Sequence, residues 1–126
     1  MECRCAFVVV VSLMEENEVF DFLDDLGIDA GITDDRLYFG LSKRDTDDDF
    51  QLNNFIHESL STILIKKDKL IELKNNYKCS YILDVKFSDI EEEIANRQSF
   101  IIDDEIKQFL LDTDTYYNLN DGYFDE

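Results

Sequence analysis

The sequence predicts an α+β protein, with an antiparallel or mixed sheet of about four to five strands and helices packed on one face of that sheet. Stretches rich in β-branched and aromatic residues, typical of strands, alternate with stretches in which apolar residues recur at helical spacing. The chain has 126 residues, of which 44% are hydrophobic, and this suffices for one hydrophobic core. We therefore expect a single domain over residues 1–126.

The expected elements follow from these patterns in chain order. They are a central strand at 3–13, a helix around 19–26, a second strand at 36–41, a helical region from about 49 to 77, a strand at 79–87, a short helix around 106–110 and a short strand or hairpin at 115–124. The first strand is apolar on both faces, which predicts a position inside the sheet. The first helix is followed by Gly27, which suits the left-handed residue after a helix C-terminus.

The first half of the chain also contains two acidic segments that we expect to be irregular. Residues 28–35 combine carboxylates with turn-forming residues, and the segment 42–49 is predicted to be a loop that leads into the long helical region. Between them, Gly40 is expected to mark a bulge in the second strand, because glycine adopts the bulged conformation without strain. A break near residues 65–66 is compatible with one kinked helix or with two.

Alternation of apolar and polar side chains is clearest at residues 79–87 and predicts a half-buried strand there. Residues 99–102 favour a further short strand, and the carboxylates at 103–105 suit the N-terminus of the last helix. The order of strands and helices suggests a relative of the ferredoxin-like fold.

The charge balance is the strongest constraint on function. The chain carries 30 Asp and Glu against 12 Lys and Arg, for a formal net charge of −18. Because nucleic acids and anionic membranes bind proteins through Lys and Arg, both are disfavoured as direct partners. A basic protein is the expected partner, although an acidic surface also serves solubility alone.

Cysteine usage and the N-terminal segment predict a cytoplasmic protein. The cysteines are Cys3, Cys5 and Cys79, and their odd number does not suit a disulfide framework. The apolar run at 6–11 is too short for a signal sequence or a membrane span. We therefore expect no export of the chain.

None of the motifs that usually hold a metal or a cofactor is complete. The run from Asp45 begins like an EF-hand loop, but Phe50 stands where that loop needs Gly and Ile56 where it needs Glu. The cysteines and His57 have the residue types of a zinc site without its usual spacing, so buried thiols are the simpler expectation. The glycines are isolated and form no phosphate-binding loop. We expect no metal, no cofactor and no catalytic residues, and hence a protein that is not an enzyme.

Carboxylates beside aromatic residues have the composition of a protein interface with a charged rim. Aromatic residues near the end of the chain, such as Tyr116 and Phe124, have the alternative role of closing the core. The candidate partner-binding residues are Asp34, Asp35, Asp45, Asp47, Asp48, Asp49, Asp112, Asp114, Tyr116, Tyr117, Asp121, Tyr123 and Asp125.

Residues 58–67, residues 70–77 and the alternating strand after them resemble a small uncharacterised bacterial α+β domain family. Small acidic domains of this kind are similar to the immunity proteins of bacterial toxin and immunity pairs, including those of contact-dependent growth inhibition. The resemblance implies a protein that binds a cognate toxin domain in a 1:1 complex in the cytoplasm and neutralises it, with a basic nuclease as the expected toxin.

Two other classes of protein remain open at this point. A DNA-mimic inhibitor of a restriction or defence nuclease requires carboxylates spaced like the phosphates of a duplex. A small ligand-binding domain or enzyme requires a concave pocket with convergent polar groups. Surface geometry distinguishes these classes from an inhibitor of a basic toxin.

Overall fold

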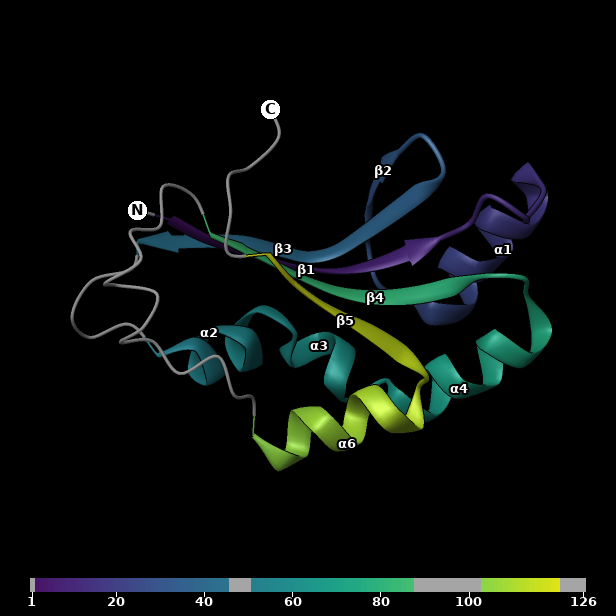
Figure 1. Ribbon diagram of the computed structural model, residues 1–126. Coiled ribbons are helices and arrows are strands. Elements are labelled where there is room, and N and C mark those ends of the chain that lie inside the picture. The colour runs from purple at the N-terminus through teal and green to yellow at the C-terminus, as the bar shows by residue number, and fades with distance from the viewer. Residues whose placement is uncertain (1, 46–50, 88–102, 121–126) are drawn as a thin grey trace.

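The computed structural model describes residues 2–45, 51–87 and 103–120 (Figure 1). Its elements follow one another in the order β1 (Glu2–Val10), α1 (Glu16–Leu26), β2 (Gly31–Thr33), β3 (Arg36–Asp45), α2 (Leu52–Ser59), α3 (Ser61–Leu64), α4 (Lys67–Asn76), β4 (Ser80–Phe87), α6 (Asp104–Asp112) and β5 (Thr115–Asn120). Within the described residues, the strands form one five-stranded sheet in the order β2-β3-β1-β4-β5. The α+β class and the mixed sheet are as predicted.

The first four strands have the connectivity of a ferredoxin-like fold. β1 is antiparallel to both of its neighbours, β3 and β4, and β2 is antiparallel to β3. The connection through α1 joins β1 to β2 with β3 between them, and the connection through α2, α3 and α4 joins β3 to β4 with β1 between them. This split arrangement agrees with the prediction. α6 and β5 extend it, because β5 pairs with the outer edge of β4 in parallel.

The hydrophobic core lies between the sheet and the helices, with α2, α3, α4 and α6 along one face of the sheet (Figure 1). Phe22 and Leu26 of α1 belong to the same core cluster. At its centre, the ring centroid of Phe7 on β1 lies 5.4 Å from that of Tyr81 on β4 and 6.0 Å from that of Phe109 on α6. Burial of one such ring stabilises the fold by about 1.5–3 kcal/mol. The prediction of helices packed on one face of the sheet is confirmed, because the strands and helices contribute to the same core cluster.

The other side of the sheet carries the alternate residues of each strand. Arg4 and Val8 of β1 alternate with the buried residues of the core, and Val8 lies opposite Tyr38 on β3 and Ile82 on β4. In the part of the chain that the structure describes, the core helices all lie on the opposite side. Val8 is nevertheless buried, so this second side of the sheet is not open to solvent along its whole length.

The predicted bulge at Gly40 is confirmed. The pairing register between β1 and β3 shifts between Cys5 and Phe7, and Gly40 has a φ of 60°. A Cβ at this position would overlap the backbone carbonyl oxygen of Ser59 on α2. Glycine is therefore required both by the backbone conformation and by the close approach of the helix.

Element bounds differ from the prediction mainly at edges. The loop expected at 42–49 was wrong in its first part, because β3 continues to Asp45 through pairing with residues 2–5 of β1. β2 lies in the stretch 28–35, which was expected to be irregular. It was not predicted because its three residues are all exposed and therefore show no alternation of apolar and polar side chains. The possible strand at 99–102 lies outside the described residues.

The first strand and the long helical region also differ from the prediction. β1 ends at Val10 rather than at residue 13. The helical region begins at Leu52 rather than near residue 49, and it is divided into α2, α3 and α4 rather than one kinked helix or two. The break between α2 and α3 falls at Leu60, whose φ and ψ of −110° and 16° are not helical.

Candidate protein-binding site

One segment of the chain, residues 5–35, carries only negative charge on its side chains. Residues 5–35 contain no Lys, Arg or His, and α1 contributes most of the carboxylates of this segment. Glu16 and Glu18 lie in the first turn of α1, where they interact favourably with the positive end of the helix dipole. The segment therefore concentrates negative potential where α1 meets the β2–β3 hairpin.

A cleft of about 370 Å³ opens between the N-terminal part of α1 and this hairpin. Val19 and Phe20 of α1 and Ile32 of β2 contribute apolar walls. The charged residues that line it are all carboxylates, namely Glu16, Asp34 and Asp35. We call this feature the acidic cleft.

Large apolar side chains are exposed at and beside the acidic cleft. Phe20 is 53% exposed and Ile32 54% exposed, and the neighbouring Leu13 is 77% exposed. Phe20 lies off the buried side of α1, which faces the core through Phe22 and Leu26. Exposed apolar side chains inside a charged rim are typical of protein interfaces.

The hairpin turn places Asp34 and Asp35 at the rim of the cleft. Asp34 has a φ of 52°, a left-handed conformation that aspartate tolerates better than most residues. The backbone carbonyl of Asp35 accepts a hydrogen bond of 2.8 Å from the N–H of Val11, which ties the hairpin to the end of β1. Arg36 Nε lies 3.9 Å from Asp35 Oδ1, and this half-exposed pair neutralises the rim only weakly.

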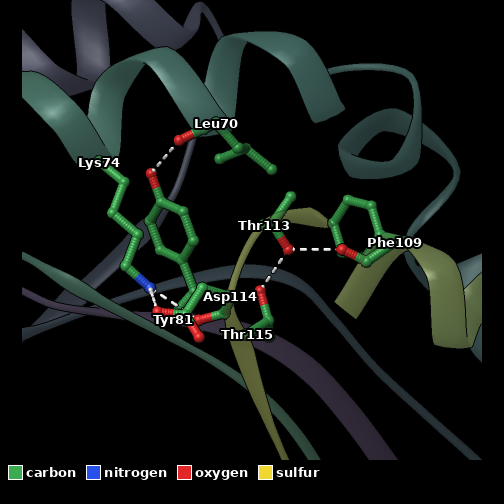
Figure 2. A network of polar contacts seen from close by, with 7 residues as sticks. All are labelled: Leu70, Lys74, Tyr81, Phe109, Thr113, Asp114 and Thr115. Carbon is green, nitrogen blue, oxygen red and sulfur yellow. Dashed lines mark hydrogen bonds and ion pairs between the residues drawn. The ribbon is translucent and has the colours of Figure 1, made fainter. Parts of the chain in front are cut away.

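Asp112 and Asp114, by contrast, interact with lysines of the same chain beside β5. Lys67 Nζ donates to Asp112 Oδ2 at 2.8 Å, and Lys67 and Gln108 hold the pKa of Asp112 below its usual value. Lys74 Nζ donates to the backbone carbonyl of Asp114 at 2.7 Å (Figure 2). These predicted site residues therefore connect α4 to the end of α6.

The two adjacent tyrosines of β5 point to opposite faces of the sheet. Tyr116 is 67% exposed, whereas Tyr117 packs against the core. Burial, followed by the nearby thiols of Cys5 and Cys3, raises the pKa of Tyr117 to about 12. Tyr117 thus serves the core, although it was predicted to bind a partner. The alternative role of closing the core is wrong for Tyr116, which is exposed and available to a partner, and Phe124 lies outside the described residues.

Asp45, another predicted residue, lies far from the acidic cleft. β3 has ten residues, so Asp45 at its end lies about 30 Å along the strand from Asp35. Of the predicted residues that the structure describes, Asp34 and Asp35 are the ones that line the cleft. Six further predicted residues lie outside the described residues, namely Asp47, Asp48, Asp49, Asp121, Tyr123 and Asp125.

Sequence reasoning missed Leu13, Glu16, Phe20 and Ile32. Two signals in the sequence point to them. Phe20 is an apolar residue outside the helical stripe that Val19 begins, and the absence of cations over residues 5–35 marks the whole segment. Ile32 gives no signal of its own, because it lies on a three-residue strand.

The cysteines and the histidine occupy structural positions. Cys3 and Cys5 are buried on the inner face of β1, and burial raises the pKa of each thiol to about 12. A protonated thiol is a poor nucleophile and a poor metal ligand. His57 Nε2 lies 2.7 Å from Oδ2 of Asp103, whose other oxygen caps the N-terminus of α6. Among the described residues, no His, Cys, Asp and Glu side chains are grouped to hold a metal ion.

Comparison with known proteins adds no relative: the chain matches no protein-family model, no curated protein and no solved structure. In the described part of the chain, no helix has the length and apolar character needed to cross a membrane. The functional argument therefore rests on the fold and on the acidic cleft.

Proposed function

We propose that the protein is an immunity-type inhibitor, which binds a basic toxin domain in a 1:1 complex in the cytoplasm and neutralises it. The observation that carries this proposal is the acidic cleft, where exposed Phe20 and Ile32 lie beside the carboxylates of Glu16, Asp34 and Asp35. A nuclease is the expected toxin, because a nuclease must be basic to hold the phosphates of its substrate.

The two components of the cleft have different roles in this proposal. The carboxylates of Glu16, Asp34 and Asp35 attract a cationic partner and speed its association, and they contribute less to affinity. The apolar side chains supply affinity, because anchors that become fully buried in the complex dominate binding energy. A partner that presents an apolar side chain among Lys and Arg residues complements both components.

Binding rather than catalysis is the activity we propose. The thiols of Cys3 and Cys5 are buried and protonated at neutral pH, so they are unsuited to nucleophilic attack. The hydrogen bond of His57 to Asp103 gives this side chain a role in joining α2 to α6. Both observations favour structural roles for the residue types that most often act as nucleophile and base.

The direct test is titration of a purified toxin domain, encoded beside this chain, with the purified protein. We expect its nuclease activity to disappear at an equimolar ratio and light scattering to give the mass of a 1:1 complex. Full activity at saturating protein, with no complex in the light-scattering trace, would contradict the proposal. Inhibition of unrelated DNA-binding nucleases, relieved by added duplex DNA, would instead favour a DNA mimic.

A further inference from the structure

The edge strand β2 is accessible to another chain. Within the described residues, β2 pairs with β3 alone and is the outermost strand on its side of the sheet. All three of its residues are exposed, and a Cβ added at Gly31 would meet no atom within 4 Å. An exposed edge of this kind offers backbone groups for pairing with a further strand.

The register of the β2–β3 hairpin determines which backbone groups point outward. Thr33 and Arg36 flank a turn of two residues, so this closing pair exchanges both of its backbone hydrogen bonds. Bonded and non-bonded pairs alternate along an antiparallel ladder, and the next pair, Ile32 with Leu37, is therefore non-bonded. The N–H and C=O of Ile32 thus point away from β3, toward the outer edge of the sheet.

The same register places the side chain of Ile32 on the helical side of the sheet. Residues directly opposite each other share a face, and Leu37, opposite Ile32, is buried in the core. The adjacent pair, Thr33 and Arg36, points to the other face. Ile32 and Phe20 of α1 both line the acidic cleft. A residue paired with Ile32 from an added strand would therefore place its side chain over this cleft.

The hairpin is held in place by the rest of the chain. The N–H of Val11 donates a hydrogen bond of 2.8 Å to the carbonyl of Asp35, which joins the turn to the end of β1. On β3, the fully buried side chain of Leu37 anchors the strand in the core. A strand that is already ordered loses little conformational freedom when another strand pairs with it, and this favours binding.

Charge selects the occupant of this edge. Asp29 precedes β2 and Asp34 follows it, and both are exposed. Glu16 and Asp35 add two further carboxylates at the cleft. A second copy of this chain would bring the same carboxylates and a formal charge of −18 to the edge, and like charges repel. A strand that carries Lys or Arg complements the edge instead.

From these observations we propose that the toxin domain adds one extended strand to the outer edge of β2. The N–H and C=O of Ile32 bond to the backbone of this strand, and an apolar residue of the strand packs against Ile32 and Phe20. A Lys or Arg two positions along lies on the same face and interacts with the carboxylates of the cleft. This inference rests on the proposed function and specifies how the partner binds.

Exchange of backbone amide protons with water tests this binding mode. The isotope-labelled protein is studied by NMR, first alone and then in complex with the unlabelled toxin domain. We expect the amide of Ile32 to exchange at least about tenfold more slowly in the complex. The amides of Gly31 and Thr33, which already bond to β3, are internal controls and should change much less.

Two substitutions at one position separate the backbone contact from the side-chain contact. Ile32→Pro removes the N–H that points outward, and an edge strand tolerates proline at such a position. Ile32→Ala keeps this N–H and shortens the side chain. We expect the dissociation constant for the toxin domain to be about tenfold higher in the proline variant than in the alanine variant. Circular dichroism checks that both variants fold, and the exchange measurement needs no substitution.

The outcomes distinguish this binding mode from the proposed function. A complex in which the amide of Ile32 exchanges as fast as in the free protein would overturn the added strand and leave the inhibitor role intact. Equal affinities of the two folded variants would have the same meaning. Absence of any complex would refute both proposals. Slower exchange at Ile32 in the free protein as its own concentration rises would place a second copy on the edge and overturn the basic strand.

Discussion

Lys74 Nζ on α4 donates a hydrogen bond of 2.7 Å to the backbone carbonyl of Asp114, in the turn between α6 and β5 (Figure 2). The same nitrogen lies 4.9 Å from the ring centroid of Tyr81, whose hydroxyl donates to the carbonyl of Leu70 at 2.8 Å. Asp114 has a φ of 51°, so this contact holds a residue in a conformation that non-glycine residues rarely adopt. One lysine thus joins α4, β4 and the start of β5.

The first prediction concerns this lysine. Lys74→Ala should lower the free energy of unfolding by about 1–2 kcal/mol, because it removes a charge-assisted hydrogen bond and a cation–π contact. Urea denaturation followed by circular dichroism measures the change. Lys69→Ala is the control on the same helix, since Lys69 has the weak pair with Glu72 at 3.7 Å, and it should change stability by less than about 0.5 kcal/mol. Equal effects of the two substitutions would refute the role of Lys74.

The second prediction concerns the bulge in β3. Gly40→Ala should lower the free energy of unfolding by about 2–4 kcal/mol, because alanine is strained at a φ of 60° and its Cβ overlaps the carbonyl oxygen of Ser59. Gly31→Ala is the matched control, since a Cβ there meets no atom within 4 Å. It should leave the thermal midpoint almost unchanged. A stable Gly40→Ala variant would show that the bulge relaxes.

The third prediction concerns stability at acid pH. The N–H of Ile106 and, to a smaller extent, the hydrogen bond from His57 hold the pKa of Asp103 below its usual value. The stabilisation is therefore fully present above the unfolded pKa of about 3.9 and is lost as the pH falls through the lower folded value. Asp103→Ala should cost about 1 kcal/mol at pH 7, as expected for a lost helix cap, and clearly less at the lowest pH at which the protein folds.

The control for this prediction is the neighbouring carboxylate. Asp104→Ala removes a charge from the first turn of α6 but not the side-chain cap. Its effect on urea denaturation should be smaller than that of Asp103→Ala at pH 7. A cost of Asp103→Ala that is the same at both pH values would contradict the assignment of its ionised form to the cap.

The fourth prediction separates the apolar anchors of the acidic cleft from its charges. Phe20→Ala combined with Ile32→Ala should raise the dissociation constant for the toxin domain at least about tenfold, mainly through faster dissociation, because anchors act in the formed complex. Surface plasmon resonance measures both rates. Leu111 on α6 is a more exposed apolar residue, at 75% exposure, and Leu111→Ala should leave both rates unchanged. Loss of affinity in that control alone would move the interface to the helical side.

The fifth prediction concerns the rim of the same cleft. Asp34→Asn combined with Asp35→Asn should slow association about threefold to tenfold at low salt and change dissociation little. Asparagine keeps the turn, because it also tolerates the positive φ of Asp34. The difference should vanish near 1 M salt, where the Debye length is about 3 Å. Asp68→Asn with Glu72→Gln on α4 is the charge-matched control, and an equal slowing there would indicate steering by net charge alone.

The fold was predictable where burial imposes a pattern on the sequence. β4 was predicted because Tyr81, Leu83 and Val85 are buried and alternate with residues that are more exposed to solvent. β2 was missed because none of its residues is buried, and the second half of β3 was missed because backbone pairing with β1 holds polar residues there. Pairing between distant strands leaves little trace in local composition.

The candidate site was predictable only in part, for a related reason. The density of carboxylates in the sequence predicted Asp34 and Asp35 as partner-binding residues. It predicted Asp112 and Asp114 in the same way, although these do not lie at the cleft. What distinguishes the two pairs is whether a lysine of the same chain lies beside them, and Lys67 and Lys74 come from a helix far away in the sequence. Only the tertiary structure shows which carboxylates remain available to a partner.

The central strand β1 can complete its pairing only after a late part of the chain, β4, has been synthesised. β1 is the central strand, yet one of its two neighbours, β4, is translated only after α1, β2, β3 and three further helices. Until the ribosome has passed Phe87, the emerging chain has one hydrogen-bonding edge of its most apolar strand unpaired, and such edges recruit other strands. A nascent chain that pauses before β4 is therefore the form of this protein most in need of a chaperone.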